Sequence, residues 1–579
     1  FGSAKCSNEE AYLFQKLIRT GFNTNNVDHC TRLCHASSVA ALLETIGSGA
    51  VTAPFYEVEH SEVIIVIGAN PTENHPVAAT FFKNAAKKGS KLIVMDPRGH
   101  ALKKHATHML QFNPGSDVAL LNSIMNVIIE ENLFNEEYIK KQTSGFDELQ
   151  KHLKKYPPEL MEEQTGIDSN MIREVARLYA KTKKGIIFWG MGVSQHVHGT
   201  DNARCLISLA LMTGNVGRRG SGLHPLRGQN NVQGASDAGL IPMMYPDYQL
   251  VDKEEKKVFF EKFWNTALDD KKGLTVVEIM EAIHEDTIKG MYILGENPAM
   301  SDPDLNHARR ALQMLNHLVV QDIFLTETAT YADVIFPASA WPEKNGTVTN
   351  TNRQVQMGRK AIDSPGLAKE DWWITNELGK RMGLNWNYKH PKDIYEEMSK
   401  TMPSLNNISW ERIQKESSVT YPSKSPTAPG DEIVFGDRFP NDTGKGKFVP
   451  ASVTSPNEIP DEDFAMILTT GRQLEHWHTG VMTRKASNLD AIEPEATVSI
   501  SPNETYKKNM KAGDRIRVST RRGSINIRVR EDRSIPEGVI FLPFCYNEAA
   551  ANLLTNSALD PYGKIPEFKY CAAKIEKID

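Results

Sequence analysis

The sequence of 579 residues predicts a multi-domain α/β protein that ends in a small β-barrel, and three observations lead to this prediction. A buried-strand pattern at 61–68 is followed by helical spacing and by a second strand pattern at 91–95, which together form a β–α–β unit. A similar pattern of strands and turns recurs between 291 and 337. Alternating apolar and polar residues at 514–529 are typical of barrel strands.

The overall charge and hydrophobicity exclude two classes of partner. The net charge of -5 arises from 67 basic and 72 acidic residues without a long basic stripe, so nucleic acid is not an expected partner. No run approaches the roughly 18 apolar residues of a membrane span, and no signal pattern opens the chain. We expect a cytoplasmic protein, with the reservation that an export signal could precede Phe1, which is not a methionine.

The cysteines are few and scattered, which does not fit a disulfide framework and fits a reducing compartment. No pair has the CxxC spacing, so this segment encodes no iron–sulfur cluster motif. The cysteines are Cys6, Cys30, Cys34, Cys205, Cys545 and Cys571.

The segment 28–35 places the thiol of Cys34 next to the imidazole of His35 at the start of an apolar helical run. Thiolates are soft metal ligands, and Arg32 or a protonated His35 would favour the ionised thiol. The pair is therefore a candidate reaction centre. The alternative is that Cys34 is a small buried residue and His35 a hydrogen-bonded core histidine.

The turn at 68–76 follows the first strand, at the edge where open α/β sheets bind ligands, although it is not a GxGxxG fingerprint. Asp96 and Arg98 close the second strand, where a carboxylate can accept from ribose or guanine and a guanidinium can meet phosphate. A nucleotide is the predicted ligand, and a plain strand-end turn is the alternative.

Helical spacing predominates at 119–180, and a strand pattern resumes at 185–190, where we expect a second α/β domain to begin. The Gly-Met-Gly that follows is not a dinucleotide fingerprint, because Gln195 occupies the place of the third glycine.

The segment 224–239 is rich in amides and glycines and suits a loop around a polar ligand. Within it, Arg227 carries a planar fork that can grip a carboxylate through two hydrogen bonds. The alternative is a surface loop with a solvated arginine.

Gly-Glu-Asn-Pro at 295–298 follows a strand pattern, as Gly-Ala-Asn-Pro at 68–71 does. The repeat predicts two nucleotide-binding halves, one for each of two dinucleotide ends. Residues 419–461 read as a linker. In the segment after it, His476 and His478 would point to the same side of a strand. A zinc pair there is disfavoured, because no third ligand is suggested nearby.

Seven segments then carry a resemblance that covers nearly the whole chain. They are FGSAKCSNEE at 1–10, TNNVDHCTRLCH at 24–35, GANPTENHP at 68–76, LRGQNNVQGASDAG at 226–239, VQDIFLTETATYADVIFPA at 320–338, GTVTNTNRQVQ at 346–356 and GRQLEHWHTG at 471–480. With them, the chain resembles the molybdenum- or tungsten-dependent formate dehydrogenases of the molybdopterin oxidoreductase family. The Cys-His pair and the LRGQNNVQG loop are the specific elements.

The resemblance implies that Cys34 ligates the metal, His35 assists proton transfer and Arg227 orients formate, which is oxidised to carbon dioxide. Similar periplasmic nitrate reductases typically have methionine after the cysteine and lack the arginine. Where some family members carry selenocysteine, this chain has cysteine, which leaves the reaction class intact and puts its speed in doubt.

The implied cofactor is bis-molybdopterin guanine dinucleotide with Mo or W. The implied fold is the family's multi-domain α/β architecture, with two doubly wound α/β domains and a C-terminal double-psi β-barrel. The implied cofactor contacts are Asn70, Glu73, Asp96, Arg98, Met191, Gln195, Gly228, Gln229, Gln321, Asp322, Thr326, Asp333, Arg472, His476, His478 and Asn552.

Family members usually carry a [4Fe-4S] cluster motif upstream of the point where this chain begins, so we expect that motif outside this segment and an iron–sulfur or other electron-acceptor subunit as partner. The expected parts are a metal-ligand segment (1–50), an α/β cofactor-binding domain (51–182), a second one with the substrate loop (183–420), a linker (421–460) and the barrel (461–579).

Other functions remain as alternatives. One is another family member, such as a nitrate reductase or a subunit acting as a carbon dioxide reductase. Another is a scaffold subunit that has lost the metal, against which the joint presence of Cys34, His35 and Arg227 argues. A nicotinamide dehydrogenase and a serine hydrolase are weaker, because the chain has neither a GxGxxG after a strand nor a GxSxG elbow.

Overall fold

The computed structural model describes residues 1–578, which form two compact units built from discontinuous segments. The first unit comprises Phe1–Arg32, Arg227–Asp302 and His307–Glu432. The second unit comprises Leu33–Leu226, Pro303–Asn306 and Ile433–Asp579. The linear domain limits expected from the sequence remain predictions.

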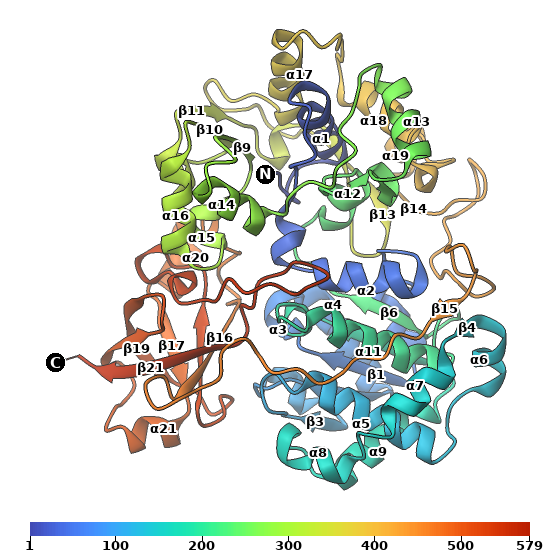
Figure 1. Cartoon of the computed structure of the whole chain (residues 1–579), viewed down its shortest axis with the longest axis vertical. Coiled ribbons are helices and arrows are strands. Elements are labelled where there is room, and N and C mark those ends of the chain that lie inside the picture. The colour runs from blue at the N-terminus through green and yellow to red at the C-terminus, as the bar shows by residue number, and fades with distance from the viewer. Residues whose placement is uncertain (579) are drawn as a thin grey trace. The chain divides into compact units, whose positions relative to one another are not determined.

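A parallel sheet of order β3-β2-β1-β5-β6 forms the centre of the α/β part of the second unit (Figure 1). The β–α–β unit predicted at 61–95 is confirmed by β1, helix α4 and β2. The strands are β1 (Val63–Ile67), β2 (Lys91–Met95), β3 (His108–Leu110), β5 (Gly185–Trp189) and β6 (Gly222–Pro225).

Helices cover both faces of this sheet, which is the doubly wound arrangement. Ile65 and Ile67 pack into one apolar cluster, and Ile64 and Val66 into another on the opposite face. Both faces are buried, which explains the continuous apolar run of β1. The main helices are α2 (Ala36–Ile46), α4 (Pro76–Lys87), α5 (Asp117–Glu130), α9 (Ser169–Ala180) and α11 (Gly199–Met212).

The strand β5 differs from its expected position. The sequence predicted that it opens a second α/β domain, whereas it pairs in parallel with β1 in the sheet just described. All of its residues are buried, and a strand apolar on both faces is stabilised best at the centre of a sheet covered on both sides.

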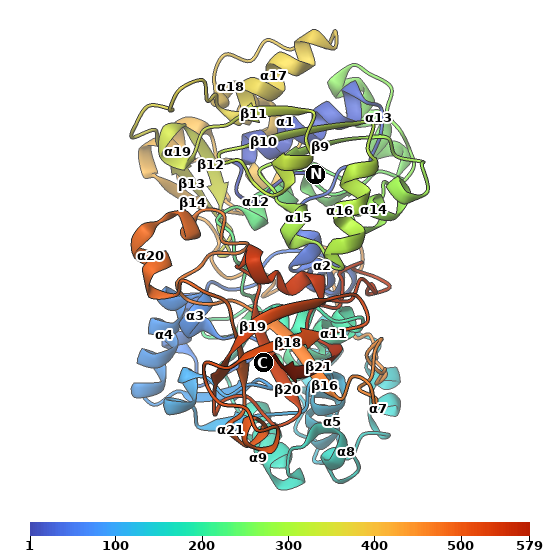
Figure 2. The same ribbon diagram turned by 90° about the vertical axis from the view of Figure 1, so that its left-hand side faces the viewer.

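The predicted C-terminal barrel is confirmed as a closed barrel of order β16-β20-β17-β19-β18-β21 (Figure 2). Its alternating strands are half-buried, as in β19, where every second side chain points inward. The strands are β16 (Met466–Gly471), β17 (Thr497–Ile500), β18 (Arg515–Ser519), β19 (Ser524–Glu531), β20 (Val539–Pro543) and β21 (Cys571–Lys577).

The first unit contains the strands predicted between 291 and 337, paired in parallel in the order β11-β10-β9. An antiparallel sheet of order β12-β13-β14 lies in the same unit. The strands are β9 (Gly290–Leu294), β10 (His317–Asp322), β11 (Val334–Pro337), β12 (Gly346–Thr349), β13 (Gln354–Gly358) and β14 (Ser418–Thr420).

Helix α1 (Asn8–Gly21) anchors the first unit, because it is buried from Asn8 to Arg19. Its start is fixed by a capping box, in which Ser7 accepts from the backbone of Glu10 and Glu10 accepts from that of Ser7. It packs against α12 (Val232–Asp237), α17 (Asp371–Arg381) and α18 (Pro391–Ser399).

The predicted linker carries little regular structure. Its short strand β15 (Gly446–Lys447) pairs with β4 (Thr143–Ser144) in the second unit. Within residues 1–578, no helix has both the length and the apolar character needed to cross a bilayer.

Asp302, directly after α15 (Pro298–Ser301), should make the stability of the first unit depend on pH. Burial raises its pKa from 3.8 to about 8, and within residues 1–578 its Oδ2 meets no hydrogen-bond donor. A carboxyl group whose pKa is higher in the folded than in the unfolded protein favours the folded state while it is protonated. This contribution is complete below the unfolded pKa of about 3.9 and is lost as the pH rises toward 8.

Asp302→Asn should therefore gain stability relative to the wild type, on the order of 1 kcal/mol per pH unit between pH 5 and 8. Thermal unfolding of both proteins across this range measures the difference. The exposed Asp363→Asn is the control, and a difference independent of pH for Asp302→Asn would contradict the expectation.

Candidate active site

A pocket in the second unit lies at the carboxyl ends of β1, β2, β5 and β16, where the sequence predicted a nucleotide. The sheet and the barrel together bring residues from Gly68 to Lys569 into one pocket. The predicted residues that line it are Asn70, Glu73, Asp96, Arg98, Met191 and Arg472.

Glycines allow two of the turns that line this pocket to approach each other closely. Gly68 follows β1 with φ +55°, and its carbonyl accepts from the backbone of Gly192 at 2.9 Å. A Cβ at Gly192 would lie 2.7 Å from that carbonyl oxygen, which is too close for any side chain. The contact places Asn70 and Met191 in the same pocket.

Asp96 and Arg98 end β2 as the sequence predicted. The Asp96 carboxylate accepts from the backbone of Arg98 at 2.9 Å, and the Arg98 guanidinium carbon lies 3.7 Å from the centre of the Phe541 ring. Burial raises the pKa of Glu73, and the charge of Arg98 opposes that shift.

Lys569, which the sequence reasoning missed, is a third basic side chain in the pocket besides Arg98 and Arg472. It donates to the carbonyl of Thr470 at 2.6 Å. Burial, together with the charges of Arg98 and Arg472, lowers its pKa to about 7. Such crowding of cations is relieved by a bound anion, so the site fits phosphate groups.

Asp117 and His196 also line the pocket and were not predicted. Burial raises the pKa of Asp117 to about 6, and its Oδ1 has no hydrogen-bond partner among residues 1–578. A buried polar atom of this kind indicates a place for a ligand with donors. The sequence signal was weak, since Asp117 reads as a helix first-turn acid and Lys569 as a surface lysine before a strand.

Cys34 lies in the turn between the 3₁₀ helix Cys30–Leu33 and α2, and its side chain is buried. A thiolate at Cys34 would raise the pKa of Lys569, which lines the pocket. The predicted reaction-centre cysteine and the predicted nucleotide residues thus belong to one region of the second unit.

His35 is fully buried and held from both ring nitrogens. Its Nε2 lies 2.8 Å from the carbonyl oxygen of Leu226, and its Nδ1 lies 3.3 Å from the hydroxyls of Ser38 and Ser194. Because a carbonyl only accepts, Nε2 carries the hydrogen and Nδ1 is the basic nitrogen. The indole of Trp189 donates to Ser38 at 2.8 Å and fixes the hydroxyl pair.

The histidines after β16 do not lie on a strand, contrary to the expectation. β16 ends at Gly471, and His478 has φ +50° in the left-handed region. His478 lies 2.8 Å from a guanidinium nitrogen of Arg472, whereas His476 meets the carbonyl of Glu493 at 2.8 Å. The rings of His476 and His478 therefore contact different groups, and this geometry does not indicate a metal bound by both.

Two further predicted contacts lie outside the residues that line the pocket. The amide of Gln195 donates to the carbonyl of Leu33 at 2.6 Å, next to Cys34. Asn552 is buried in the 3₁₀ helix Ala551–Leu553.

Arg227 belongs to the first unit, directly after Leu226 in sequence, and its side chain is buried. Gly228 and Gln229 follow it, and the Gln229 amide donates to the Cys30 sulfur at 3.2 Å. Asn231 fixes the loop, because its side chain donates to the carbonyl of Cys6 at 2.8 Å. The predicted solvated surface loop is thereby excluded.

The residues predicted near a second guanosine lie around β10 and β11, and protein groups already engage them. Gln321 donates to Asp371 at 2.6 Å, and Asp333 accepts from the backbone of Leu318 at 2.7 Å. Asp322 accepts from the backbone of Ile323 at 2.7 Å, and Thr326 from that of Ala329 at 3.1 Å. Their role in cofactor binding stays a prediction.

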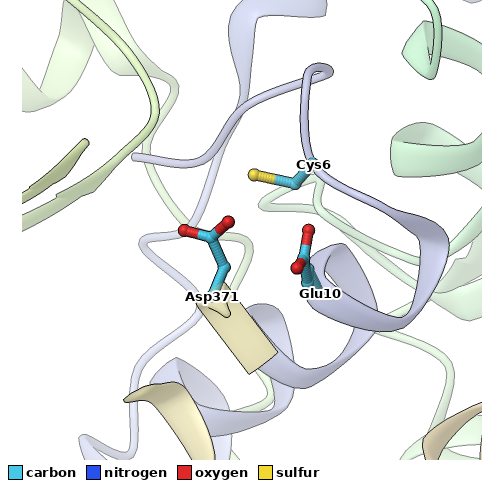
Figure 3. Close-up of side chains that lie close together, drawn as sticks. All are labelled: Cys6, Glu10 and Asp371. Carbon is cyan, nitrogen blue, oxygen red and sulfur yellow. The ribbon is translucent and has the colours of Figure 1, made fainter. Parts of the chain in front are cut away.

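Cys6, Glu10 and Asp371 converge in the first unit, with one ligand-type atom from each within 4.8 Å of the others (Figure 3). The ammonium of Lys344 binds both carboxylates, at 2.9 Å from Glu10, and all four side chains are buried. Burial alone would lower the pKa of Lys344, but the two carboxylates outweigh it and raise that pKa. The Lys344 ammonium thus occupies the position between the two carboxylates where a metal ion would bind.

Comparisons with known proteins agree with this geometry. The profile "Molybdopterin oxidoreductase" matches residues 1–381, and "Molydopterin dinucleotide binding domain" matches 466–572. The chain is 44% identical over 580 residues to the F420-dependent formate dehydrogenase subunit alpha of Methanocaldococcus jannaschii, covering 100% of this chain and 86% of that protein. It is 34% identical over 575 residues to formate dehydrogenase H of Escherichia coli, covering 99% and 80%.

The solved structure of acetylene hydratase from Pelobacter acetylenicus has the same fold, with a TM-score of 0.80 at 20% identity, covering 100% of this chain and 86% of that one. Together, the profile over 1–381, the barrel profile and the full-length relatives show the family. The chain belongs to the molybdopterin oxidoreductase family and is an oxidoreductase whose barrel is a molybdopterin dinucleotide binding domain.

Proposed function

We propose that this chain is the catalytic subunit of a formate dehydrogenase and oxidises formate to carbon dioxide. The observation that carries the proposal is Cys34, a buried thiol just before α2, in a chain 44% identical to a formate dehydrogenase subunit alpha. His35 and Arg227, the residues specific to the resemblance, accompany it.

The proposed cofactor is bis-molybdopterin guanine dinucleotide carrying Mo or W, with Cys34 as the protein ligand of the metal. Arg98, Arg472 and Lys569 would hold its phosphates, since the three basic side chains line one pocket and the two guanidinium groups lower the pKa of Lys569. Once bound, the group supplies the two-electron redox chemistry, while the protein supplies orientation and charge.

Arg227 is the proposed formate site, because a guanidinium fork matches the two oxygens of a carboxylate. Oxidation of HCOO⁻ to CO₂ releases one proton and two electrons. A proton taken up by His35 would enter at Nδ1, because Nε2 already carries a hydrogen that it donates to Leu226. The hydroxyls of Ser38 and Ser194 would then hand it on from Nδ1.

We also propose that the electrons pass to an iron–sulfur relay or another acceptor subunit outside this segment. The M. jannaschii relative is called a subunit alpha, which supports a multi-subunit enzyme, and its name describes it as F420-dependent.

The test is elemental analysis of the purified enzyme combined with formate-dependent reduction of a viologen dye. Bound Mo or W with formate turnover is expected. Metal with nitrate reduction instead of formate turnover would move the protein to the nitrate reductases. A pterin-free and metal-free protein from cells that load related enzymes would favour a scaffold subunit.

Arg227→Lys should lower kcat/KM for formate about 10- to 100-fold. A lysine keeps the charge and loses the planar fork, and a hydrogen bond to a charged group contributes about 1.5–3 kcal/mol. Steady-state kinetics on protein of equal metal content measures the loss. Arg204→Lys, at an ion pair with Glu44 in the second unit, is the control, and equal losses in both variants would argue against a substrate role.

A further inference from the structure

A histidine and a carboxylate of the second unit face each other beside the pocket. His196 lines the pocket and is buried, and its Nδ1 lies 3.8 Å from a carboxylate oxygen of Glu567, which is buried completely. This distance is too long for a hydrogen bond and short enough for electrostatic attraction. Among the side chains of residues 1–578, His196 is the one basic group that faces this carboxylate. A buried carboxylate without a lysine or arginine is costly, so the facing imidazole is its main compensation.

Backbone contacts hold the two segments that carry these side chains. The Lys569 backbone donates to the carbonyl of Gln195 at 3.3 Å, and the Val197 backbone donates to one oxygen of Glu567 at 3.5 Å. The other oxygen of Glu567 accepts from the backbone of Asn457 at 2.9 Å. The segment before α11 is therefore fixed against the segment that leads into β21, and the carboxylate is held in place.

The ring of His198 stacks on the ring of His196. The ring centres are 4.9 Å apart, and the two planes differ by 16°. His198 is buried, does not line the pocket, and has no hydrogen-bond partner at either ring nitrogen among residues 1–578. Burial lowers the pKa of His198 well below its usual range, so this ring stays neutral. The stack therefore limits how the His196 ring can turn.

The carboxylate decides which ring nitrogen of His196 serves the pocket. A carboxylate oxygen only accepts, so Nδ1, which faces it, carries the hydrogen of a neutral imidazole. Nε2 is then an acceptor on the other side of the ring. Asp117 offers a further acceptor in the same pocket, because its buried Oδ1 meets no hydrogen-bond donor among residues 1–578. Buried acceptors of this kind indicate a ligand that brings N–H or O–H groups.

We propose that His196 is a cofactor-binding residue whose Nε2 accepts a hydrogen bond from a ring N–H or amino group, and that Glu567 is the positioning residue that makes Nε2 the acceptor. The inference rests on the proposed cofactor, because guanine and pterin both carry such donors on an aminopyrimidinone ring. The basic side chains attract phosphates by charge, which does not orient a ring. An acceptor whose hydrogen is fixed by a second residue does orient it, as a carboxylate does for a metal-bound histidine.

His196→Phe keeps the aromatic ring beside His198, removes both ring nitrogens, and is tested in the holoenzyme. Pterin should leave this variant about five- to tenfold faster than the wild type, as expected for one lost hydrogen bond. The measurement is pterin fluorescence in the filtrate of the purified holoenzyme over time at a fixed temperature. It reports cofactor binding and requires no turnover of formate.

His198→Phe is the matched control, because His198 is the neighbouring buried histidine and does not line the pocket. It should release pterin at the wild-type rate. His196→Gln restores an acceptor near the position of Nε2, so its release rate should lie within about threefold of the wild type. Wild-type release from His196→Phe, or equally fast release from all three variants, would overturn the inference.

Glu567→Gln separates the positioning role from a structural one. Its amide can turn an N–H toward Nδ1 of His196, which leaves the hydrogen on Nε2 and removes the acceptor, so release should become about three- to tenfold faster. In the His196→Phe background the same substitution should add less than about twofold, because the two residues act as one unit. Equal effects in both backgrounds would give Glu567 a structural role and overturn the proposal.

The EPR signal of the partly reduced metal distinguishes the two rings that carry the donor. Pterin supplies sulfur ligands of the metal, so a lost contact to pterin should shift the signal of His196→Phe. A lost contact to guanine should leave the signal unchanged while pterin release still becomes faster. A wild type that retains pterin but does not oxidise formate would overturn the proposed function alone, and a wild type purified without pterin would overturn both.

Discussion

Cys34→Ala is expected to lower formate turnover at least about a hundredfold while leaving the cofactor in place. Alanine cannot supply a thiolate, and replacing even an outer-shell partner of a metal ligand costs about 10- to 100-fold. The pocket that would hold the phosphates is unchanged by this substitution, because Arg98, Arg472 and Lys569 remain. The measurement is viologen reduction per bound metal, with pterin content determined by fluorescence.

Cys205→Ala is the matched control, since Cys205 is an equally buried thiol of the second unit that donates to Asn122 within the α11 and α5 packing. It should keep turnover per metal near the wild-type value. Retention of turnover in Cys34→Ala, within about twofold, would show that this thiol is not the metal ligand and that another residue serves the reaction.

Lys344→Met is expected to destabilise the first unit by about 3–5 kcal/mol. The substitution removes the Lys344 ammonium, which is bound to Glu10 and Asp371, and leaves two buried carboxylates close together beside Cys6. Breaking a buried ion pair from one side carries this cost because the remaining charge has neither water nor partner. The melting temperature should fall by roughly 6–20 °C.

Lys360→Met provides the control, because Lys360 pairs with Asp363 at 2.8 Å on the surface of the same unit. Exposed pairs are screened by solvent, so the melting temperature should hardly change. A similar small change in Lys344→Met would mean that the carboxylates are protonated or hydrated instead of paired. Metal uptake by the variant, measured by elemental analysis, would show whether the vacated cation position accepts an ion.

Local patterns predicted the elements that depend on short stretches of sequence. Three patterns predicted the observed elements: the apolar run of β1, the helical spacing of α4, and the alternation of β18 and β19. A strand buried on both faces is apolar throughout, a helix buried along one stripe repeats about every 3.6 residues, and a strand buried on one face alternates. The strand-end position likewise predicted a ligand near Asp96 and Arg98, and the resemblance implied Asn70 as a contact; all three residues line one pocket.

Pairing between distant segments was not predictable in the same way. β5 carries the same apolar signal whether it opens a new sheet or joins β1, and the contacts that decide between them lie more than 100 residues away. The expected strand geometry of His476 and His478 failed because β16 ends at Gly471, where tertiary contacts of Arg472 and Glu493 take over.

The sequence by itself determined the α/β class, the C-terminal barrel, and the resemblance carried by Cys34, His35 and Arg227, because these depend on residue type and local spacing. Only the tertiary structure decided that Lys569 joins Arg98 and Arg472 in one pocket, and that the Lys344 ammonium binds the carboxylates of Glu10 and Asp371 beside Cys6. The physical reason is burial: the charge and proton state of a side chain depend on the distant groups that replace its water, and spacing along the chain does not encode those groups.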